Sequence, residues 1–246
     1  MAKVRIDQLL VQRGLADSRA RAQSLITLGQ VFAAGEALAK PGKLVLEDAD
    51  IEIRGEPSPW VSRAALKLLH GLDHFGLDPA ELVALDVGAS TGGFTQVLLA
   101  KGAYRVYAID VGTGQLAASL RDDPRIVSLE KTNARYLSQQ EIPEPVGAIT
   151  CDASFIGLET LLPAPLALAA PGAFLLALVK PQFEVGPSGV GSGGIVRDEN
   201  LQKEVCDRLL AWLGARPGWK VLGLCDSPIL GGDGNREFLL AGRYQP

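Results

Sequence analysis

The feature that most constrains the fold is the stretch LDVGASTGGFT, residues 85–95. An apolar segment ends at Asp86 and runs into a glycine-rich turn, which is followed by residues that can open a helix. Gly88, Gly92 and Gly93 let a ligand approach the backbone closely, and the first turn of a helix presents free N–H groups and the positive end of its dipole. This combination predicts a strand–turn–helix unit that can hold a nucleotide-like cofactor.

The glycine spacing distinguishes between cofactors. A dinucleotide-binding turn has the pattern GxGxxG, whereas here the glycines fall at 88, 92 and 93. The GxxxGG form resembles the first motif of S-adenosylmethionine-dependent methyltransferases. A tight connection without a ligand is the alternative, and the next expected strand argues against it. That strand, YRVYAID (104–110), ends in Asp110, about twenty residues past the glycines, where an acid that binds ribose belongs.

Residues 62–246 alternate between helical and strand patterns. An opening helix is expected near 62–75, with helices between most of the later strands. This alternation predicts an α/β domain built on a doubly wound, mostly parallel sheet. The expected strands lie near 82–87, 104–110, 125–129, 146–151, 173–179, 219–225 and 236–242.

The apolar run LLPAPLALAAPGAFLLALV, residues 161–179, has about the length of a membrane-spanning helix. Two prolines interrupt its first half, and Pro171-Gly172 interrupts the second. We therefore expect a helix that ends near residue 170, a Pro-Gly turn and a buried strand over 173–179, and no membrane span.

The first 54 residues have the pattern of a separate small domain. Helices are expected near 5–13 and 18–28, and short strands follow Gly29. Residues 1–54 are thus predicted to form an α+β domain and residues 55–61 a proline-containing linker to the domain of residues 62–246. The chain has a net charge of −4, so any contact with nucleic acid must come from a local patch.

Basic side chains concentrate in this small domain: residues 1–46 hold seven basic and three acidic side chains. Solvated helix charges are one explanation, and Arg19 and Arg21 lie about 200° apart on a helix. However, RIDQLLVQRGLADSRARAQSLITLGQVFAAGEALAKPGKLV resembles the small RNA-binding domain of a ribosomal small-subunit protein of the S4 type, of pseudouridine synthases and of bacterial tyrosyl-tRNA synthetases. Ala34 departs from that domain, which often has Asn before the turn glycine. The expected RNA-binding residues are Arg5, Arg13, Arg19, Arg21, Lys40, Lys43 and Arg63.

Polar side chains stand at the ends of successive expected strands. In open α/β sheets, ligands bind beyond the carboxyl ends of the strands. Each residue alone could be a turn residue or a helix cap, but several at one edge indicate a site. Lys67, in the opening helix, and Glu237, at the start of the last strand, join them, although a surface lysine and a charge that protects a strand edge are the alternatives. The strand-end residues are Asp86, Asp110, Asn133, Asp152 and Lys180.

The larger domain resembles the FtsJ-like ribosomal RNA ribose methyltransferases, and the two-domain arrangement resembles the TlyA family, some of whose members are named hemolysins. The motifs that carry the resemblance are SR-x-x-x-KL, DVGASTGGFT, AIDVG, CDASF, KPQFE-VG with GGIVRD, and GNREFLL. The family's Lys-Asp-Lys-Glu set falls on Lys67, Asp152, Lys180 and Glu237 without substitution. Ala64-Ala65 departs from the family, in which glycine often follows SR.

This resemblance implies a Rossmann-like methyltransferase fold with a seven-stranded sheet, an antiparallel last strand and S-adenosyl-L-methionine as cofactor. It places Asp110 at the ribose hydroxyls, Asn133 near the adenine, and the glycine-rich turn around the methionine end. The expected cofactor residues are Asp86, Gly88, Ser90, Gly92, Phe94, Asp110, Val111, Asn133 and Asp152.

The chemistry explains why the Lys-Asp-Lys-Glu set is useful. A ribose 2′-hydroxyl is a poor nucleophile at neutral pH, so the protein must orient or deprotonate it. We hypothesise that Lys180 does so. A lysine among carboxylates normally stays protonated, so Lys180 needs desolvation or the charge of Lys67 to act as a base, and otherwise only orients the hydroxyl. Asp152 and Glu237 hold the two ammonium groups.

Three further features say less about function. His70 and His74 have the i, i+4 spacing of metal ligands, but the pattern lacks HExxH and offers no third ligand, so no metal is expected. The segment 184–197 is either a lid over the site or a flexible connection. Three cysteines without metal-type spacing and an N-terminus without an export signal indicate a cytoplasmic protein with free thiols.

The sequence thus predicts a methyltransferase acting on the ribose 2′-hydroxyl of a cytidine in ribosomal RNA, with free RNA or ribosomal subunits as partner. The small domain would dock structured RNA, and a nucleotide extruded from its stack would be the target. A noncatalytic RNA-binding or assembly factor on the same fold is one alternative. A hemolysin is the other, and it is suggested only by the names of relatives.

Overall fold

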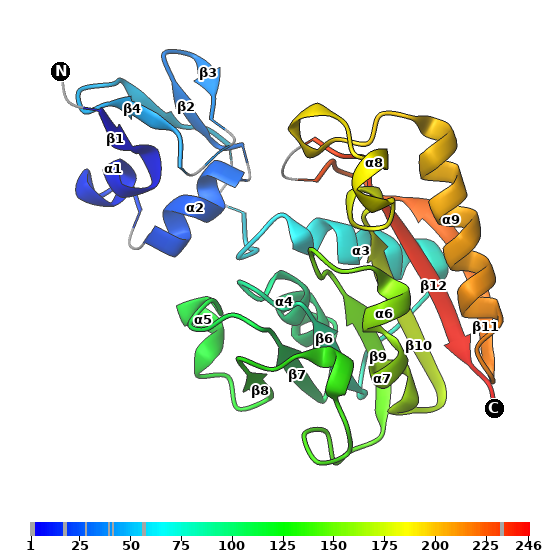
Figure 1. Cartoon of the computed structure of the whole chain (residues 1–246). Coiled ribbons are helices and arrows are strands. Elements are labelled where there is room, and N and C mark those ends of the chain that lie inside the picture. Colours follow the sequence, from blue (N-terminus) through cyan, green and yellow to red (C-terminus); the bar gives the residue numbers. More distant parts are fainter. Residues whose placement is uncertain are drawn as a thin grey trace. The chain divides into compact units, whose positions relative to one another are not determined.

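The computed structural model describes residues 3–16, 19–27, 29–38, 40, 42–55, 58–231 and 234–246. Residues 56 and 57 of the expected linker therefore lie outside the described residues. The chain divides into two compact units, Met1–Arg63 and Ala64–Pro246, which are coloured from blue to cyan and from cyan to red in Figure 1.

The described residues of the smaller unit form two helices and two small antiparallel sheets. Strand β1 pairs with β4, and β2 pairs with both β3 and β5. Its core consists of apolar residues that the helices and the first strands bury, including Ile6, Leu10, Ile26 and Val31. The elements are β1 (Lys3–Arg5), α1 (Ile6–Gln12), α2 (Arg19–Thr27), β2 (Val31–Ala33), β3 (Glu36–Ala37), β4 (Leu44–Leu46) and β5 (Ile51–Ile53).

The hairpin between β2 and β3 has an unusual turn. Ala34 and Gly35 both have positive φ, at 50° and 83°, and they join the paired residues Ala33 and Glu36. A two-residue hairpin turn with positive φ at both positions favours Asn-Gly. Ala34 thus occupies a backbone conformation that suits asparagine, the residue that the related domain often has there.

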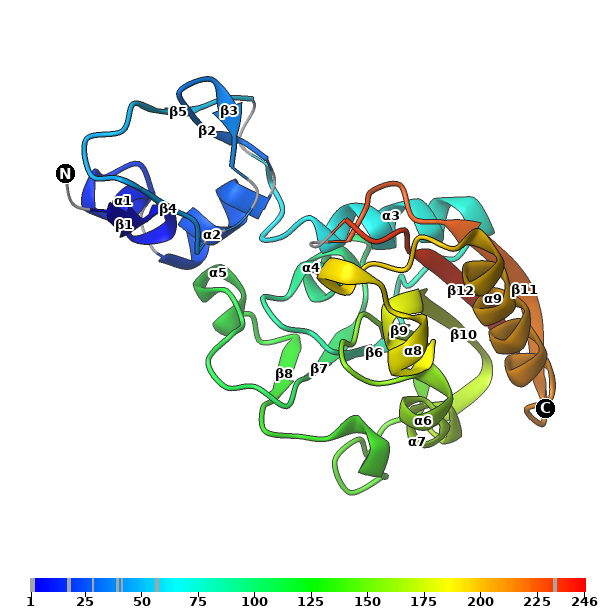
Figure 2. The same cartoon turned by 45° about the horizontal axis from the view of Figure 1, so that its top comes forward.

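The larger unit contains a seven-stranded sheet with helices on both faces, as the sequence predicts. Figures 1 and 2 show α3 and α4 on one face of the sheet and α6, α7 and α9 on the other. The helices are α3 (Ala64–Phe75), α4 (Gly93–Ala100), α5 (Ala118–Arg121), α6 (Leu158–Leu161), α7 (Pro163–Ala167), α8 (Gly186–Gly189) and α9 (Glu199–Gly214), with 3₁₀ turns η1 (Ala134–Tyr136), η2 (Pro181–Phe183) and η3 (Ser192–Gly194). The strands are β6 (Val83–Val87), β7 (Arg105–Ile109), β8 (Ile126–Leu129), β9 (Val146–Cys151), β10 (Ala169–Val179), β11 (Trp219–Asp226) and β12 (Phe238–Tyr244).

The strand order is β11-β12-β10-β9-β6-β7-β8. Strand β12 runs antiparallel to both of its neighbours, and the pairs among β6, β7, β8, β9 and β10 are parallel. The antiparallel last strand is confirmed. Because helices cover both faces, the central strands are nearly continuous apolar runs, and seven consecutive residues from Ala173 to Val179 are buried.

The apolar run 161–179 folds differently from the prediction in one respect. Helix α7 ends at Ala167, and β10 begins at Ala169 and includes the Pro-Gly pair, where the register against β9 shifts between Ala169 and Phe174. The expected turn is therefore an irregularity within a longer strand, with Gly172 at a φ of 85°. None of the helices formed by the described residues has the length and apolar character needed to cross a membrane.

Candidate functional site

The loops after three adjacent strands line one cavity of about 470 Å³. These loops follow β6, β7 and β9, whose parallel arrangement brings their carboxyl ends to one edge of the sheet. Loop residues around Thr132 and the segment 153–156 line the cavity as well. Six of the nine expected cofactor residues line it: Gly88, Ser90, Asp110, Val111, Asn133 and Asp152.

The cavity depends on a close approach between the ends of β6 and β9. Gly88 has a φ of 83°, and a Cβ atom at this position would lie 2.9 Å from backbone atoms of Ala153. Any other residue would therefore separate the two strand ends. Gly92, the residue before α4, has a φ of 92°, and a Cβ there would lie 2.5 Å from Leu120 Cδ1. Its role in the structure is to let α4 begin close to α5.

Asp86 and Phe94 do not line the cavity. Phe94 is buried in α4, and Asp86 is fully buried at the end of β6. Thr95 Oγ1 donates a hydrogen bond of 2.6 Å to Asp86, and Thr150 Oγ1 donates one of 3.3 Å. Burial raises the pKa of Asp86 to about 7, although both hydrogen bonds lower it. Asp86 thus ties β6 to α4 and β9 and supports the turn from behind.

Asp110 shapes the loop as well as facing the cavity. The Ser90 N–H donates to one carboxylate oxygen at 2.8 Å, and the Gly112 N–H donates to the other at 2.7 Å. Each carboxylate oxygen can accept a further hydrogen bond, so Asp110 can hold the turn and also receive hydroxyl groups. Asn133 accepts a hydrogen bond from the Arg135 N–H through Oδ1, which directs its amide group at the start of η1.

Lys67, Asp152, Lys180 and Glu237 form two ion pairs. Lys67 Nζ lies 2.5 Å from Glu237 Oε2, and Lys180 Nζ lies 2.7 Å from Asp152 Oδ1. Lys67, Lys180 and Glu237 are at most 9% exposed. Because desolvation offsets much of the attraction in a buried ion pair, two such pairs are weak evidence for a stabilising role. The two ion pairs therefore indicate a functional site whose chemistry uses buried charged groups.

The strand register brings the two ion pairs together. Val179 of β10 pairs with Phe238 of β12, so Lys180 and Glu237 stand at the next step of the same ladder. Lys180 Nζ also donates to Ser154 Oγ at 3.0 Å and lies 3.4 Å from the backbone oxygen of Asp152. Because Asp152 and Ser154 line the cavity, the Lys180–Asp152 pair adjoins the space lined by the glycine-rich turn, and the register places Glu237 opposite Lys180.

Two residues of this region were not predicted as site residues. Phe155 lines the cavity, is 90% exposed, has a φ of 65°, and its ring lies 5.0 Å from that of Phe183. Asn235 is 1% exposed, accepts a hydrogen bond from the Val196 N–H and donates one to the Gly194 carbonyl. Both residues belong to motifs quoted above, CDASF and GNREFLL, but their backbone conformation and partners have no sequence signal.

Asn235 also bears on the segment 184–197, which was expected to be a lid or a flexible connection. The segment contains α8 and η3, and Asn235 fastens its end to the residues before β12. Gln202 of α9 holds the same point by donating to the Val196 carbonyl at 2.7 Å. The end of the segment is therefore anchored two residues from Glu237 in sequence.

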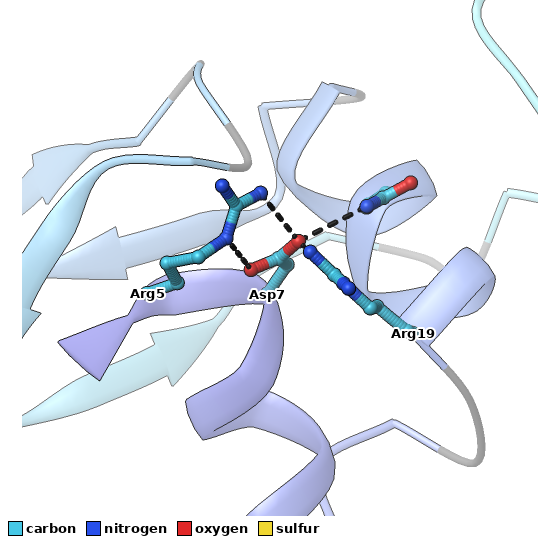
Figure 3. Close-up of polar contacts among 4 residues, drawn as sticks. Arg5, Asp7 and Arg19 are labelled. Carbon is cyan, nitrogen blue, oxygen red and sulfur yellow. Dashed lines mark hydrogen bonds and ion pairs between the residues drawn. The ribbon is translucent and has the colours of Figure 1, made fainter.

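Several expected RNA-binding residues in the smaller unit make contacts within that unit. Asp7, which is fully buried, accepts hydrogen bonds from Arg5, Arg19 and Gln23, as Figure 3 shows. These donors, Arg5 foremost, lower the pKa of Asp7 well below its usual range. Arg13 donates to the backbone carbonyls of Glu47 and Ala49. These arginines therefore also hold the unit together.

The other expected RNA-binding residues are Lys40, Lys43, Arg21 and Arg63. Lys40 and Lys43 are exposed and border one hollow of the smaller unit. Arg21 borders a second hollow, beside Leu25 and Gln30. Arg63 is half-buried and directly precedes α3.

Comparisons with known proteins find two family patterns in different parts of the chain. The pattern of the FtsJ-like methyltransferase family matches residues 60–244, and that of the S4 domain matches residues 4–51. The 16S/23S rRNA (cytidine-2′-O)-methyltransferase TlyA of Mycobacterium tuberculosis is 45% identical over 244 residues, which cover 99% of this chain and 91% of the relative. Hemolysin A of Brachyspira hyodysenteriae is 35% identical over 96% of this chain and 98% of the relative.

Solved structures share the fold. A structure from Streptococcus thermophilus that carries the name hemolysin is 38% identical, has a TM-score of 0.76, and is matched over 100% of this chain and 90% of its own. An O-methyltransferase from Bacillus cereus in complex with SAH is 20% identical, with a TM-score of 0.51 over 76% of this chain and 82% of its own.

Proposed function

The chain belongs to the FtsJ-like methyltransferase family, within its TlyA group, and from this premise we propose that it methylates a ribose 2′-hydroxyl of ribosomal RNA with S-adenosyl-L-methionine. The relative from M. tuberculosis is named for cytidine, and we propose cytidine as the target here too. The observation that carries the proposal is the two ion pairs, Lys67–Glu237 and Lys180–Asp152, of which the second reaches the cavity through Asp152.

The size and lining of the cavity support S-adenosyl-L-methionine as the cofactor. Its volume of about 470 Å³ suits a ligand of this size, and its lining offers a carboxylate, an amide and a glycine backbone as contacts for a nucleoside with a charged tail. Asp110 would receive the ribose hydroxyls, Asn133 would face the adenine, and Gly88 and Ser90 would border the methionine end. Asp86, Gly92 and Phe94 would support the turn without touching the ligand. The bound cofactor supplies an activated methyl group.

Lys180 is the residue that we assign to the acceptor hydroxyl. Asp152 and Ser154 hold its ammonium group at the cavity. The protein itself therefore orients Lys180, without help from a ligand. In its charged form Lys180 would orient the hydroxyl, and in its neutral form it would accept the proton that the hydroxyl loses as its oxygen takes the methyl group. Glu237 fixes Lys67 next to this pair and so keeps a second positive charge nearby.

The RNA would be held by both units. The S4 unit offers exposed Lys40 and Lys43 for phosphate contacts, which are the source of sequence-independent affinity. In the larger unit, the exposed ring of Phe155 stands at the cavity and would stack on a nucleobase that is extruded from its helix.

The decisive experiment measures transfer of labelled methyl from S-adenosyl-L-methionine to ribosomal subunits and to free ribosomal RNA. We expect transfer by the wild-type chain, loss by Lys180→Ala, and retained RNA binding by that variant. A wild-type chain that binds subunits but transfers no methyl group would be a noncatalytic assembly factor. Full transfer by Lys180→Ala at saturating substrates would contradict the role of Lys180. Mapping of 2′-O-methyl sites in cells with and without the gene identifies the nucleotide.

A further inference from the structure

His70, His74 and Cys225 lie close together in the larger unit. The proposed methyl transfer uses none of them. The two histidines lie one turn apart on α3, and Cys225 is on β11, the edge strand that packs beside α3 in Figure 2. One ligand atom of each residue lies within 4.8 Å of the other two. The sequence pattern lacked a third ligand for the histidine pair, and the fold supplies it from a distant part of the chain.

The donor set has a defined chemical preference. Two imidazoles and one thiolate are ligands for zinc and similar divalent transition metals, whereas hard cations prefer oxygen. A tetrahedral zinc ion with ordinary bond lengths places its ligand atoms about 3.3–3.6 Å apart. The present separations, up to 4.8 Å, need only a contraction of about 1 Å, which rotamer changes of exposed histidines can provide.

Within the ranges that the structure describes, none of the three residues has a hydrogen bond or ion pair through its side chain, and the histidines make only ring contacts with each other and with Phe75. Both histidines are exposed and Cys225 is half-buried, so an ion can enter from solvent. A fourth position remains open to water.

We propose that His70, His74 and Cys225 form a binding site for a single Zn²⁺ ion. The site links α3 to the edge strand β11. His74 follows Lys67 by seven residues, two turns along the same side of the helix, so a bound ion fixes the helix that presents Lys67 to Glu237. The expected consequence is a more stable larger unit.

The test uses the full chain, reduced with a phosphine and freed of metal with a chelator. Zn²⁺ is titrated in competition with a chromophoric chelator, and Co²⁺ is used as a spectroscopic substitute. We expect one Zn²⁺ per chain, a cobalt–thiolate absorption band, and a higher melting temperature with Zn²⁺. His74→Ala and Cys225→Ser should each weaken binding at least about tenfold, and Cys225→Ser should abolish the band.

Cys206→Ala is the matched control, because Cys206 is also a free cysteine of the larger unit but lies in the core outside the cluster. It should bind Zn²⁺ as the wild type does. Circular dichroism checks that each variant is folded. The proposal is overturned if the wild type binds no stoichiometric Zn²⁺, or if a folded Cys225→Ser variant binds it with wild-type affinity. Neither result depends on methyl transfer.

Discussion

Lys67 Nζ lies 2.5 Å from Glu237 Oε2, so the first helix of the larger unit is joined to the segment that opens its last strand. Both groups are buried, and each neutralises the other's charge. Removing one partner leaves an isolated buried charge, which is much more costly than removing both.

We therefore expect Glu237→Ala to lower the free energy of unfolding by about 3–5 kcal/mol and to abolish methyl transfer. The double variant Lys67→Met with Glu237→Leu should recover most of the stability, because apolar residues of similar size replace the pair, but not the activity. Urea unfolding and the transfer assay measure the two effects. If the double variant regained activity, the pair would be structural only.

Asp86 should make stability depend on pH. Burial raises its pKa from 3.8 to about 7 in the folded state, so the folded chain binds a proton that the unfolded chain releases. The stability this proton contributes is fully present below pH 3.8 and is lost as pH rises through about 7, by a total on the order of 4 kcal/mol. Asp86→Asn should remove this dependence. Urea unfolding from pH 5 to 8 tests it, and equal pH slopes for both proteins would contradict the assignment.

Asp110 should control cofactor affinity. Asp110→Ala removes both the acceptor for ribose hydroxyls and the anchor of the Ser90 and Gly112 N–H groups. We expect cofactor affinity to fall at least about tenfold, since a hydrogen bond to a charged group contributes roughly 1.5–3 kcal/mol. Calorimetric titration with S-adenosyl-L-methionine measures the change. Asp78→Ala, which removes an exposed aspartate of the same unit that accepts a hydrogen bond from the Ala80 N–H, should leave the affinity unchanged.

Phe155 should contribute to RNA binding and not to the stability of the fold. Its positive φ is unfavourable for a side chain with a Cβ, and the gain from removing the Cβ offsets the loss of the ring contact with Phe183, so Phe155→Gly should change the free energy of unfolding by less than about 1 kcal/mol. The same variant should reduce transfer to RNA, because stacking on a base contributes about 1–3 kcal/mol, while cofactor affinity stays unchanged. Phe155→Trp should retain activity. A Phe155→Gly variant with wild-type transfer kinetics would rule out stacking.

Replacing Ala34 should stabilise the smaller unit. Ala34 is exposed and has a φ of 50° in the β2–β3 turn, a conformation that asparagine adopts more readily than alanine. Ala34→Asn should stabilise the smaller unit by about 0.5–1 kcal/mol, and Gly35→Ala, at a φ of 83°, should destabilise it. Thermal melting of the full chain with both variants compares them. A lower melting temperature for Ala34→Asn would contradict the turn geometry.

The sheet was predictable because strands covered on both faces are short apolar runs with clear ends. The start of β10 was not, because Pro171-Gly172 normally marks a turn. Here both residues are exposed at the beginning of the strand, where a lost ladder hydrogen bond can be replaced by water.

The motifs likewise identified the four charged residues of the site, but they did not predict which residues form ion pairs. Which lysine meets which carboxylate depends on the packing of α3 and the register of β12, and neither has a local signal. The distinction between Asp110, which faces the cavity, and Asp86, which supports the turn, also appears only in three dimensions. For the same reason, the sequence does not show that Cys225 lies beside His70 and His74.

The register between β10 and β12 limits how this family can vary. Because side chains alternate along a strand, sliding β12 by one residue would turn Glu237 to the opposite face of the sheet and leave Lys67 alone. Strand β12 is hydrogen-bonded on both edges, to β10 and β11, so such a slip would break two ladders at once. Insertions and deletions should therefore be excluded from β12, so that the length of this strand stays the same among proteins that keep the site.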